Sequence, residues 1–331
     1  MLRIAKVAGA LCGLLMSSQV IAGGYADHQL ASEFVAKLEK EGFNRAELLH
    51  ILSQAERKDS ILEAMSRPAE RRLTWGEYRD IFIKQARIQG GVAFWDQYAN
   101  TLSRAEQQFG VPAEIIVAII GVETNFGRNM GRYRVLDALA TLGFDYPKRS
   151  EFFLKELGEY LRLTREEKID PLKHVGSYAG AMGYGQFMPS SYRHYAIDFD
   201  GDGRRDIWDN PVDAIGSVAN YFVAHGWKAN GVAVLPVKQP ETQEWRGLLA
   251  EGLKPSTPLS SMRSQGLSVP AFLGDQDGLL MEMETASGPQ LWLGLHNFYV
   301  ITRYNHSRLY ALAVHELAAE IRNARANAKG G

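Results

Sequence analysis

An uninterrupted apolar run from Ile115 to Val122 constrains this chain more than any other part of its sequence. Pro112, just before the run, suits the first turn of a helix, because the missing N–H of proline has no helical partner there. A helix that is apolar around most of its circumference must be buried. The sequence therefore predicts a core helix that begins at Pro112 and ends near Gly127, since glycine commonly terminates helices.

One carboxylate lies at the end of this run. On a period of 3.6 residues, Glu123 shares a face with Ile116 and Ile120. Burial disfavours the charged form of a carboxyl group, so we expect a raised pKa for Glu123. A carboxyl group that keeps its proton near neutral pH can act as a general acid. The alternative is structural: Glu123 reaches solvent or forms an ion pair with Arg128.

Length and composition describe an ordinary globular protein. The chain has 331 residues, of which 46% are hydrophobic and 23% charged, enough for one large domain or several small ones. The formal net charge of −1 argues against a nucleic-acid partner, which would call for a basic surplus. It leaves open a neutral polymer such as a glycan.

The first 22 residues have the pattern of a secretory signal peptide. A short basic start precedes an apolar segment over residues 7–16, which is too short to span a membrane. The alternative is a buried N-terminal helix. We expect export to the periplasm. Lipid anchoring is not expected, because Leu11 stands before Cys12 where a lipoprotein needs a small residue. Cys12 is the only cysteine, so the exported protein has no disulfide.

Glycines crowd residues 176–185 and would let the backbone approach another surface closely. Their order does not match a dinucleotide-binding fingerprint, and no apolar strand precedes them. Ser177, Tyr184 and Gln186 are polar groups in this otherwise apolar segment. They suit hydrogen bonding to sugar hydroxyl and acetamido groups. The alternative is a tight turn with incidental polar residues.

Residues 198–209 resemble a calcium-binding loop of the EF-hand type. Asp198, Asp200 and Asp202 occupy positions 1, 3 and 5, and a glycine occupies position 6. Crowded carboxylates repel one another unless a cation binds them. Asp209 stands at the twelfth position in place of the usual glutamate, which weakens the match. A solvated acidic turn is the alternative.

Other segments indicate organisation more than chemistry. Residues 27–66 read as short amphipathic helices, and Asn44 followed by Glu47 has the spacing of a capping box at the start of the second. Residues 280–293 read as two strands joined by a turn. Aromatic residues between positions 78 and 109 are expected in the core, although Tyr78 could reach a sugar-binding cleft. Residues 297–301 form a strand-like apolar run, and Ser307 is a suitable N-cap for a helix after it.

Two segments together resemble the lytic murein transglycosylases of the membrane-bound transglycosylase B family. The first is residues 121–127, which read GVETNFG, and the second is residues 177–192, which read SYAGAMGYGQFMPSSY. The resemblance implies an α+β fold, predominantly α, with a lysozyme-like core. The sequence patterns and the resemblance together divide the chain into a signal peptide (1–22), a helical domain (25–95), a catalytic core (96–235) that includes the loop 198–213, a small loop and strand subdomain (236–289) and a C-terminal segment (290–331).

The resemblance also implies roles for individual residues. Glu123 is the catalytic acid, Ser177 is its partner, and Gln186 binds glycan. Tyr221 is implied as a cleft aromatic, with a buried packing role as its alternative, and Tyr304, Asn305 and Tyr310 form the wall opposite Glu123. In the acidic loop, Asp213 resembles the terminal ligand of a lengthened loop, with Arg204 contributing its backbone carbonyl. We expect one structural calcium ion and no organic cofactor.

The implied activity is cleavage of the β-1,4 bond between N-acetylmuramic acid and N-acetylglucosamine in peptidoglycan. The muramic 6-hydroxyl attacks the anomeric carbon and leaves a 1,6-anhydro end, so one acid suffices. Asp137 and Asp145 are the nearest further carboxylates in sequence, and neither has a cleft signature. The alternatives are a muramidase that hydrolyses the same bond and a wall-binding scaffold without turnover. We expect a monomer, with cell-wall synthesis proteins as possible partners.

Overall fold

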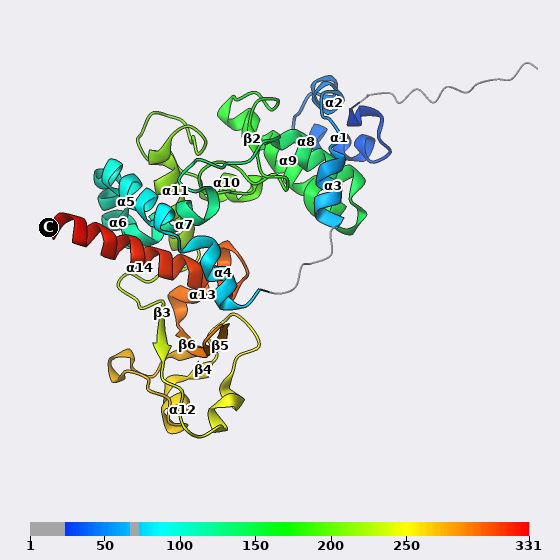
Figure 1. The fold of residues 1–331 in the computed structure, drawn as a ribbon. Coiled ribbons are helices and arrows are strands. Elements are labelled where there is room, and N and C mark those ends of the chain that lie inside the picture. The colour runs from blue at the N-terminus through cyan, green and yellow to red at the C-terminus, as the bar shows by residue number, and fades with distance from the viewer. Residues whose placement is uncertain (1–23, 67–72, 331) are drawn as a thin grey trace, which may run out of the picture.

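The computed structural model describes residues 24–66 and 73–330, so the predicted signal peptide and Cys12 lie outside the described residues. As predicted, the fold is predominantly helical, with small antiparallel sheets (Figure 1). The helices are α1 (Ala31–Glu39), α2 (Arg45–Ser53), α3 (Asp59–Ser66), α4 (Trp75–Phe82), α5 (Gln85–Gln97), α6 (Ala99–Phe109), α7 (Ala113–Thr124), α8 (Val135–Asp145), α9 (Ser150–Glu167), α10 (Pro189–Tyr195), α11 (Pro211–Ala224), α12 (Leu259–Ser264), α13 (His296–Tyr304) and α14 (Arg308–Gly330). The strands are β1 (Tyr133–Arg134), β2 (Val175–Gly176), β3 (Val234–Val237), β4 (Thr257–Pro258), β5 (Asp277–Thr285) and β6 (Gly288–Gly294).

Helix α7 is the predicted core helix. It begins one residue later than predicted and is followed by a left-handed turn. Every residue from Ile116 to Ile120 is fully buried, because α5, α6, α11 and α14 pack around the helix. Helix α14 runs beside α7, α5 and α4 in Figure 1, so the C-terminal segment closes the core that α7 starts.

A second core lies between the N-terminal helices and the α8–α9 pair. Helices α1 to α3 contribute Val35, Leu48 and Ile61, all fully buried, and α8 and α9 pack against each other beneath them. Asn44 caps α2 as predicted, because its side-chain oxygen accepts a 3.1 Å hydrogen bond from the Glu47 N–H. Figure 1 shows these helices on the side of the molecule away from α14.

A four-stranded antiparallel sheet, in the order β3-β6-β5-β4, forms the remaining part of the fold. The predicted hairpin is β5 and β6, and Met281 lies opposite Trp292 in its register. Trp292 and Met281 belong to the core around α7, whereas Leu280 and Leu293 belong to a third core with α12. Because alternate strand residues face opposite sides, this one sheet joins two hydrophobic cores.

The prediction of a strand-like segment at residues 297–301 is wrong, because these residues lie in helix α13. Phe298 and Ile301, three residues apart, are both fully buried, as one face of a helix requires. A short apolar run with β-branched residues does not distinguish a strand from a buried helix by pattern alone, and tertiary packing decided it here. The predicted N-cap is present: Ser307 Oγ accepts a 3.3 Å hydrogen bond from the Tyr310 N–H in the first turn of α14.

Within residues 24–66 and 73–330, no single helix has the length and apolar composition to cross a membrane. Helices α6 and α7, bent by 115° relative to each other, meet that criterion only as a pair.

Candidate active site

Glu123 lies in the last turn of α7 and has one hydrogen-bond partner among the described residues. Tyr310 Oη donates to Glu123 Oε1 over 2.6 Å. Burial raises the pKa of Glu123 to about 7, and the hydrogen bond from Tyr310 acts in the opposite direction. The alternative pairing with Arg128 is not made, because Glu123 has no ion pair with any described residue. A large fraction of the Glu123 side chains therefore carries a proton at neutral pH.

The turn after α7 holds this carboxyl group in place. Asn125 and Phe126 both adopt left-handed backbone conformations, with φ of 51° and 62°. Thr124, which is fully buried, accepts a 3.0 Å hydrogen bond from the Gly127 N–H. Its hydroxyl also lies 3.0 Å from the Tyr184 carbonyl and 3.1 Å from the Ile120 carbonyl, which share its single proton. Thr124 thus ties the end of α7 to the glycine-rich segment.

Sequence reasoning missed Thr124. The available signal was a hydroxyl residue directly after Glu123, at the end of a helix whose other residues are apolar. A buried hydroxyl needs a partner, and one at a helix end can satisfy backbone groups that the helix leaves unpaired.

Three predicted tyrosines lie together on the wall formed by α11, α13 and α14. The Tyr304 and Tyr221 rings are 4.7 Å apart, between centroids. Burial and then the negative charge of Glu123 raise the pKa values of both Tyr304 and Tyr310 well above the usual range. Both phenols therefore lie near the carboxyl group. The same two causes, in the same order, raise the pKa of Tyr78 on α4, which brings this residue to the site as well.

The hydroxyl groups of this wall differ in what they bind. Tyr304 Oη donates to the Gly185 carbonyl over 2.6 Å, which joins α13 to the glycine-rich segment. Tyr221 Oη donates to the Arg303 carbonyl over 2.6 Å, and its ring stacks on His225 at 4.0 Å. These are the contacts of a packing residue, so a role for Tyr221 toward substrate stays a prediction. Asn305, in contrast, is exposed at the end of α13.

The glycine-rich segment folds as a tight loop after β2. Gly183 has φ of +66°, and an added Cβ would lie 2.3 Å from the Ile207 carbonyl oxygen, so no side chain fits there. Ser177 Oγ accepts hydrogen bonds from the Ala179 and Ala181 N–H groups, at 3.3 and 3.0 Å. No hydrogen bond between Ser177 and Glu123 is present in the described part of the chain, and the serine proton stays available to a ligand.

Gln186 is held at a fixed orientation. Its backbone is left-handed, with φ of 50°. Its side-chain NH₂ group donates to the carbonyls of Gly183 and Met130, over 3.0 and 3.3 Å. The amide oxygen is then the free end of the side chain. Tyr184, two residues earlier, is half-buried with its ring 6.4 Å from that of Phe94.

The two further carboxylates considered from the sequence take part in structure elsewhere. Asp137 is buried and accepts hydrogen bonds from Arg134 at 2.8 and 2.9 Å. Asp145 accepts a 2.6 Å hydrogen bond from Tyr25 Oη. Both carboxylates are thus engaged by partners other than Glu123.

The acidic loop gathers three carboxylates. Oxygens of Asp198, Asp200 and Asp202 lie within 4.8 Å of one another. Buried Asp213 lies apart from this trio: its oxygens accept hydrogen bonds from the N–H groups of Phe199 (2.7 Å), Asp200 (3.4 Å) and Asp206 (2.9 Å). The side chains of Arg204 and Asp209 are exposed. An all-oxygen set of this kind suits a hard divalent cation.

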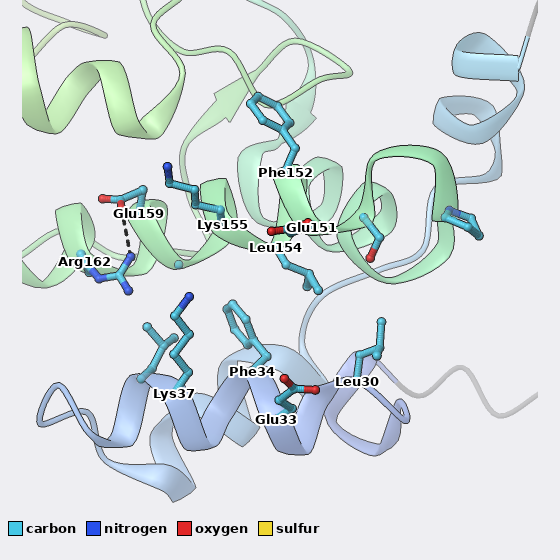
Figure 2. Close-up of a pocket in the computed structure, with 14 residues that line it drawn as sticks. Leu30, Glu33, Phe34, Lys37, Glu151, Phe152, Leu154, Lys155, Glu159 and Arg162 are labelled. Atoms are coloured by element: carbon cyan, nitrogen blue, oxygen red, sulfur yellow. Dashed lines mark ion pairs between the residues drawn. The ribbon is translucent and has the colours of Figure 1, made fainter.

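A groove of about 930 Å³ lies between α1 and α9. Figure 2 shows Phe34 and Leu154 facing each other across it, with charged side chains such as Lys37 and Lys155 along its length. None of the predicted site residues lines this groove, so it is separate from the candidate active site.

Known proteins resemble this chain over most of its length. The family model described as the transglycosylase SLT domain matches residues 26–319. Membrane-bound lytic murein transglycosylase B of Escherichia coli (strain K12) is 49% identical over 315 residues, which are 92% of this chain and 85% of that protein.

Solved structures of lytic transglycosylases have a fold similar to that of this chain. Soluble lytic transglycosylase SltB1 from Pseudomonas aeruginosa is 52% identical with a TM-score of 0.85, over 89% of this chain and 99% of that one. Escherichia coli lytic transglycosylase Slt35 in complex with calcium is 47% identical with a TM-score of 0.83, over 92% of this chain and 96% of that one. SltB3 from Pseudomonas aeruginosa in complex with NAG-NAM-pentapeptide is 32% identical with a TM-score of 0.80, over 88% of this chain and 78% of that one.

Proposed function

This chain belongs to the transglycosylase SLT domain family, whose activity is cleavage of peptidoglycan with formation of 1,6-anhydro ends, and we propose that Glu123 performs this chemistry alone. The protein is a peptidoglycan-cleaving enzyme of the lyase type, with the lysozyme-like fold that the resemblance predicted. The observation that carries the assignment of Glu123 is its partly buried carboxyl group with a pKa of about 7, whose one hydrogen-bond partner among the described residues is Tyr310.

In the first step, protonated Glu123 donates its proton to the glycosidic oxygen while the bond from the anomeric carbon to that oxygen breaks. In the second step, the muramic 6-hydroxyl attacks the anomeric carbon and gives its proton to the Glu123 carboxylate. The acid is thereby regenerated and no water is consumed. A pKa near 7 suits both transfers, because each protonation state is accessible at neutral pH.

We propose that the surrounding polar groups bind the glycan. The Ser177 hydroxyl and the Gln186 amide oxygen suit the acetamido and hydroxyl groups of the sugars, since the first has a free proton and the second a free acceptor. Tyr184 and exposed Asn305 would extend the contact, and Tyr221 and Tyr304 would form the wall behind it. Tyr310 would orient Glu123, and Thr124 would position the helix end that carries it.

We further propose that the acidic loop binds one calcium ion. The ligands would be carboxylates of Asp198, Asp200, Asp202 and Asp213 and the carbonyl of Arg204. Three amides bond to Asp213, yet two carboxylate oxygens offer about four lone-pair sites, so one site is left for a cation. The related Slt35 structure in complex with calcium supports the assignment. The ion would hold the loop together and take no part in the reaction.

We propose that the protein acts as a monomer in the periplasm after export. The support for export is the sequence of residues 1–22, and the support for a peptidoglycan strand as partner is the SltB3 structure with NAG-NAM-pentapeptide. Whether cell-wall synthesis proteins bind it as well stays a prediction.

Mass spectrometry of the soluble products of murein digestion tests the reaction. The proposal requires fragments that end in 1,6-anhydro-N-acetylmuramic acid. Fragments with reducing ends, heavier by one water, would identify a muramidase, and an absence of products would leave only a binding protein.

A further inference from the structure

Arg308 lies in the first turn of α14, two residues before Tyr310, and is partly buried. Its Nη2 group donates hydrogen bonds to the backbone carbonyls of Ala250 and Gly252, the second over 2.6 Å. Burial lowers the pKa of this guanidinium from its usual value, and no described carboxylate counteracts the effect. Arg308 is therefore a donor that fastens two carbonyls to α14, and it is not one half of an ion pair.

The loop that carries these carbonyls is attached to the four-stranded sheet. The Ala250 N–H donates to the Leu280 carbonyl of β5 over 3.1 Å. Earlier in the loop, Trp245 is fully buried in the third core, and Leu249 packs against the same core. The loop thus belongs to the sheet subdomain, and Arg308 bonds that subdomain to the first turn of α14.

The first turn of α14 is also the turn that places the phenol beside Glu123. The N–H groups of a first turn have no helical partners, so helix ends move more readily than helix interiors. The cap on this turn is a long hydrogen bond, 3.3 Å from the Tyr310 N–H to Ser307 Oγ. The bond from Tyr310 Oη to Glu123 is short, at 2.6 Å, and such bonds weaken steeply when distance or angle changes. A small displacement of the turn would therefore change this bond.

We propose that Arg308 is a positioning residue that sets the hydrogen bond from Tyr310 to Glu123. Arg308 holds the first turn of α14 against the loop at residues 250–252, and the turn places the phenol. The inference rests on the proposed function, in which Glu123 is the acid. It gives the sheet subdomain an effect on the acid, although none of the residues proposed to bind glycan comes from β3 to β6. The alternative is that packing of α14 along α7 and α5 places Tyr310 by itself.

Titration of the Glu123 carboxyl group tests the proposal without turnover. The probe is the Glu123 Cδ signal of protein labelled with ¹³Cδ-glutamate, assigned with Glu123→Gln. Its midpoint should lie at about pH 7 in the unmodified protein. Arg308→Met removes the donors but keeps an unbranched side chain, and it should raise the midpoint by about one pH unit, as expected for a weakened hydrogen bond to a charged group. Arg308→Gln, whose amide can keep one of the two bonds, should raise the midpoint by less.

A second background separates positioning from loss of charge. In Tyr310→Phe protein the phenol is absent, so Arg308→Met should leave the midpoint where Tyr310→Phe puts it. Arg322→Met is the matched control, because it removes an exposed arginine from the other end of α14 and should not move the midpoint. A midpoint unmoved by both changes at Arg308 would overturn the proposal in favour of packing alone. Equal shifts with and without the phenol, or an equal shift in Arg322→Met, would overturn it in favour of a charge effect.

Cleavage kinetics test the consequence for the enzyme. In Arg308→Met, kcat should fall and its alkaline limb should move to higher pH together with the midpoint. KM should change little, since Arg308 is not among the groups proposed to bind glycan. A limb that stays in place while the midpoint moves would overturn the effect on catalysis. Failure of the unmodified protein to cleave murein would instead refute the proposed function, and the carboxyl titration would still decide the role of Arg308.

Discussion

Tyr310 donates a 2.6 Å hydrogen bond to Glu123 from a helix that begins nearly two hundred residues later in the chain. The phenol keeps its own proton, because burial and the nearby carboxylate raise its pKa well above the usual range. It is therefore a permanent donor, and it favours the charged form of Glu123 against the effect of burial. The balance between these two effects sets the pKa of Glu123 at about 7.

Replacement of Glu123 by glutamine should abolish turnover. The amide keeps the shape of the side chain but cannot donate an acidic proton, so a loss of at least ~100-fold in kcat is expected for a general acid. The rate at which each protein releases soluble fragments from purified murein measures this loss. Near-normal release by Glu123→Gln would remove Glu123 from the mechanism.

The same substitution should stabilise the protein at neutral and higher pH. The folded state holds the Glu123 proton up to about pH 7, whereas the unfolded state releases it near pH 4.5, so the folded state binds more protons between these values. Stability contributed by this group thus falls as pH rises from about 4.5 through 7, by up to about 3 kcal/mol. Glutamine removes this dependence. Denaturant unfolding at pH 5 and pH 8 should show Glu123→Gln gaining stability relative to the unmodified protein only at the higher pH; a pH-independent difference would contradict the assignment.

Replacement of Tyr310 by phenylalanine should shift the pH profile. Activity needs protonated Glu123, so it declines as pH rises through the pKa of that group. Loss of the Tyr310 hydrogen bond, which lowers this pKa, should move the alkaline limb to higher pH while reducing kcat. Rates measured from pH 5 to 9 check this, with Tyr221→Phe as the control because its hydroxyl bonds to a backbone carbonyl. A lower rate with an unmoved limb would mean that Tyr310 only packs.

Replacement of Thr124 by valine should loosen the turn that carries Glu123. The Gly127 N–H loses its acceptor and the Tyr184 carbonyl loses its donor, at a cost of about 1–3 kcal/mol for unpaired buried groups. Thr124→Ser keeps the hydroxyl and should retain most of the stability and activity. Unfolding free energies and kcat of the two variants are compared, and a larger loss in Thr124→Ser than in Thr124→Val would mean that the methyl group matters and the hydroxyl does not.

Calcium should stabilise the fold without entering the reaction. A ligand that binds only the folded state at 100 times its Kd adds about 2.7 kcal/mol, so the melting temperature should rise by several degrees over that in chelator. Asp200→Asn should reduce this response, because it removes one of the three clustered charges. Identical melting temperatures in saturating calcium and in chelator would refute the proposal that the acidic loop binds calcium.

Local patterns were enough to predict many elements of this protein. The apolar run predicted α7 and the raised pKa of Glu123, because burial follows from composition and a pKa shift follows from burial. The hairpin of β5 and β6 and the cap of α2 followed from strand alternation and from the Asn44–Glu47 spacing. The spacing of Asp198, Asp200 and Asp202 likewise predicted that their carboxylates gather, because a short loop leaves them few other arrangements.

Only the tertiary structure decided which groups surround these elements. Nothing local to Glu123 indicates that Tyr310 bonds to it instead of Arg128, since that contact depends on how α14 packs on α7. Residues 297–301 became the helix α13, because packing of Phe298 and Ile301 outweighed the strand preference of their sequence. The groove between α1 and α9 likewise joins residues that lie more than a hundred positions apart in the sequence. A sequence specifies the chemistry of each side chain and the period of each element, whereas the surroundings that set a pKa or form a cavity come from long-range packing.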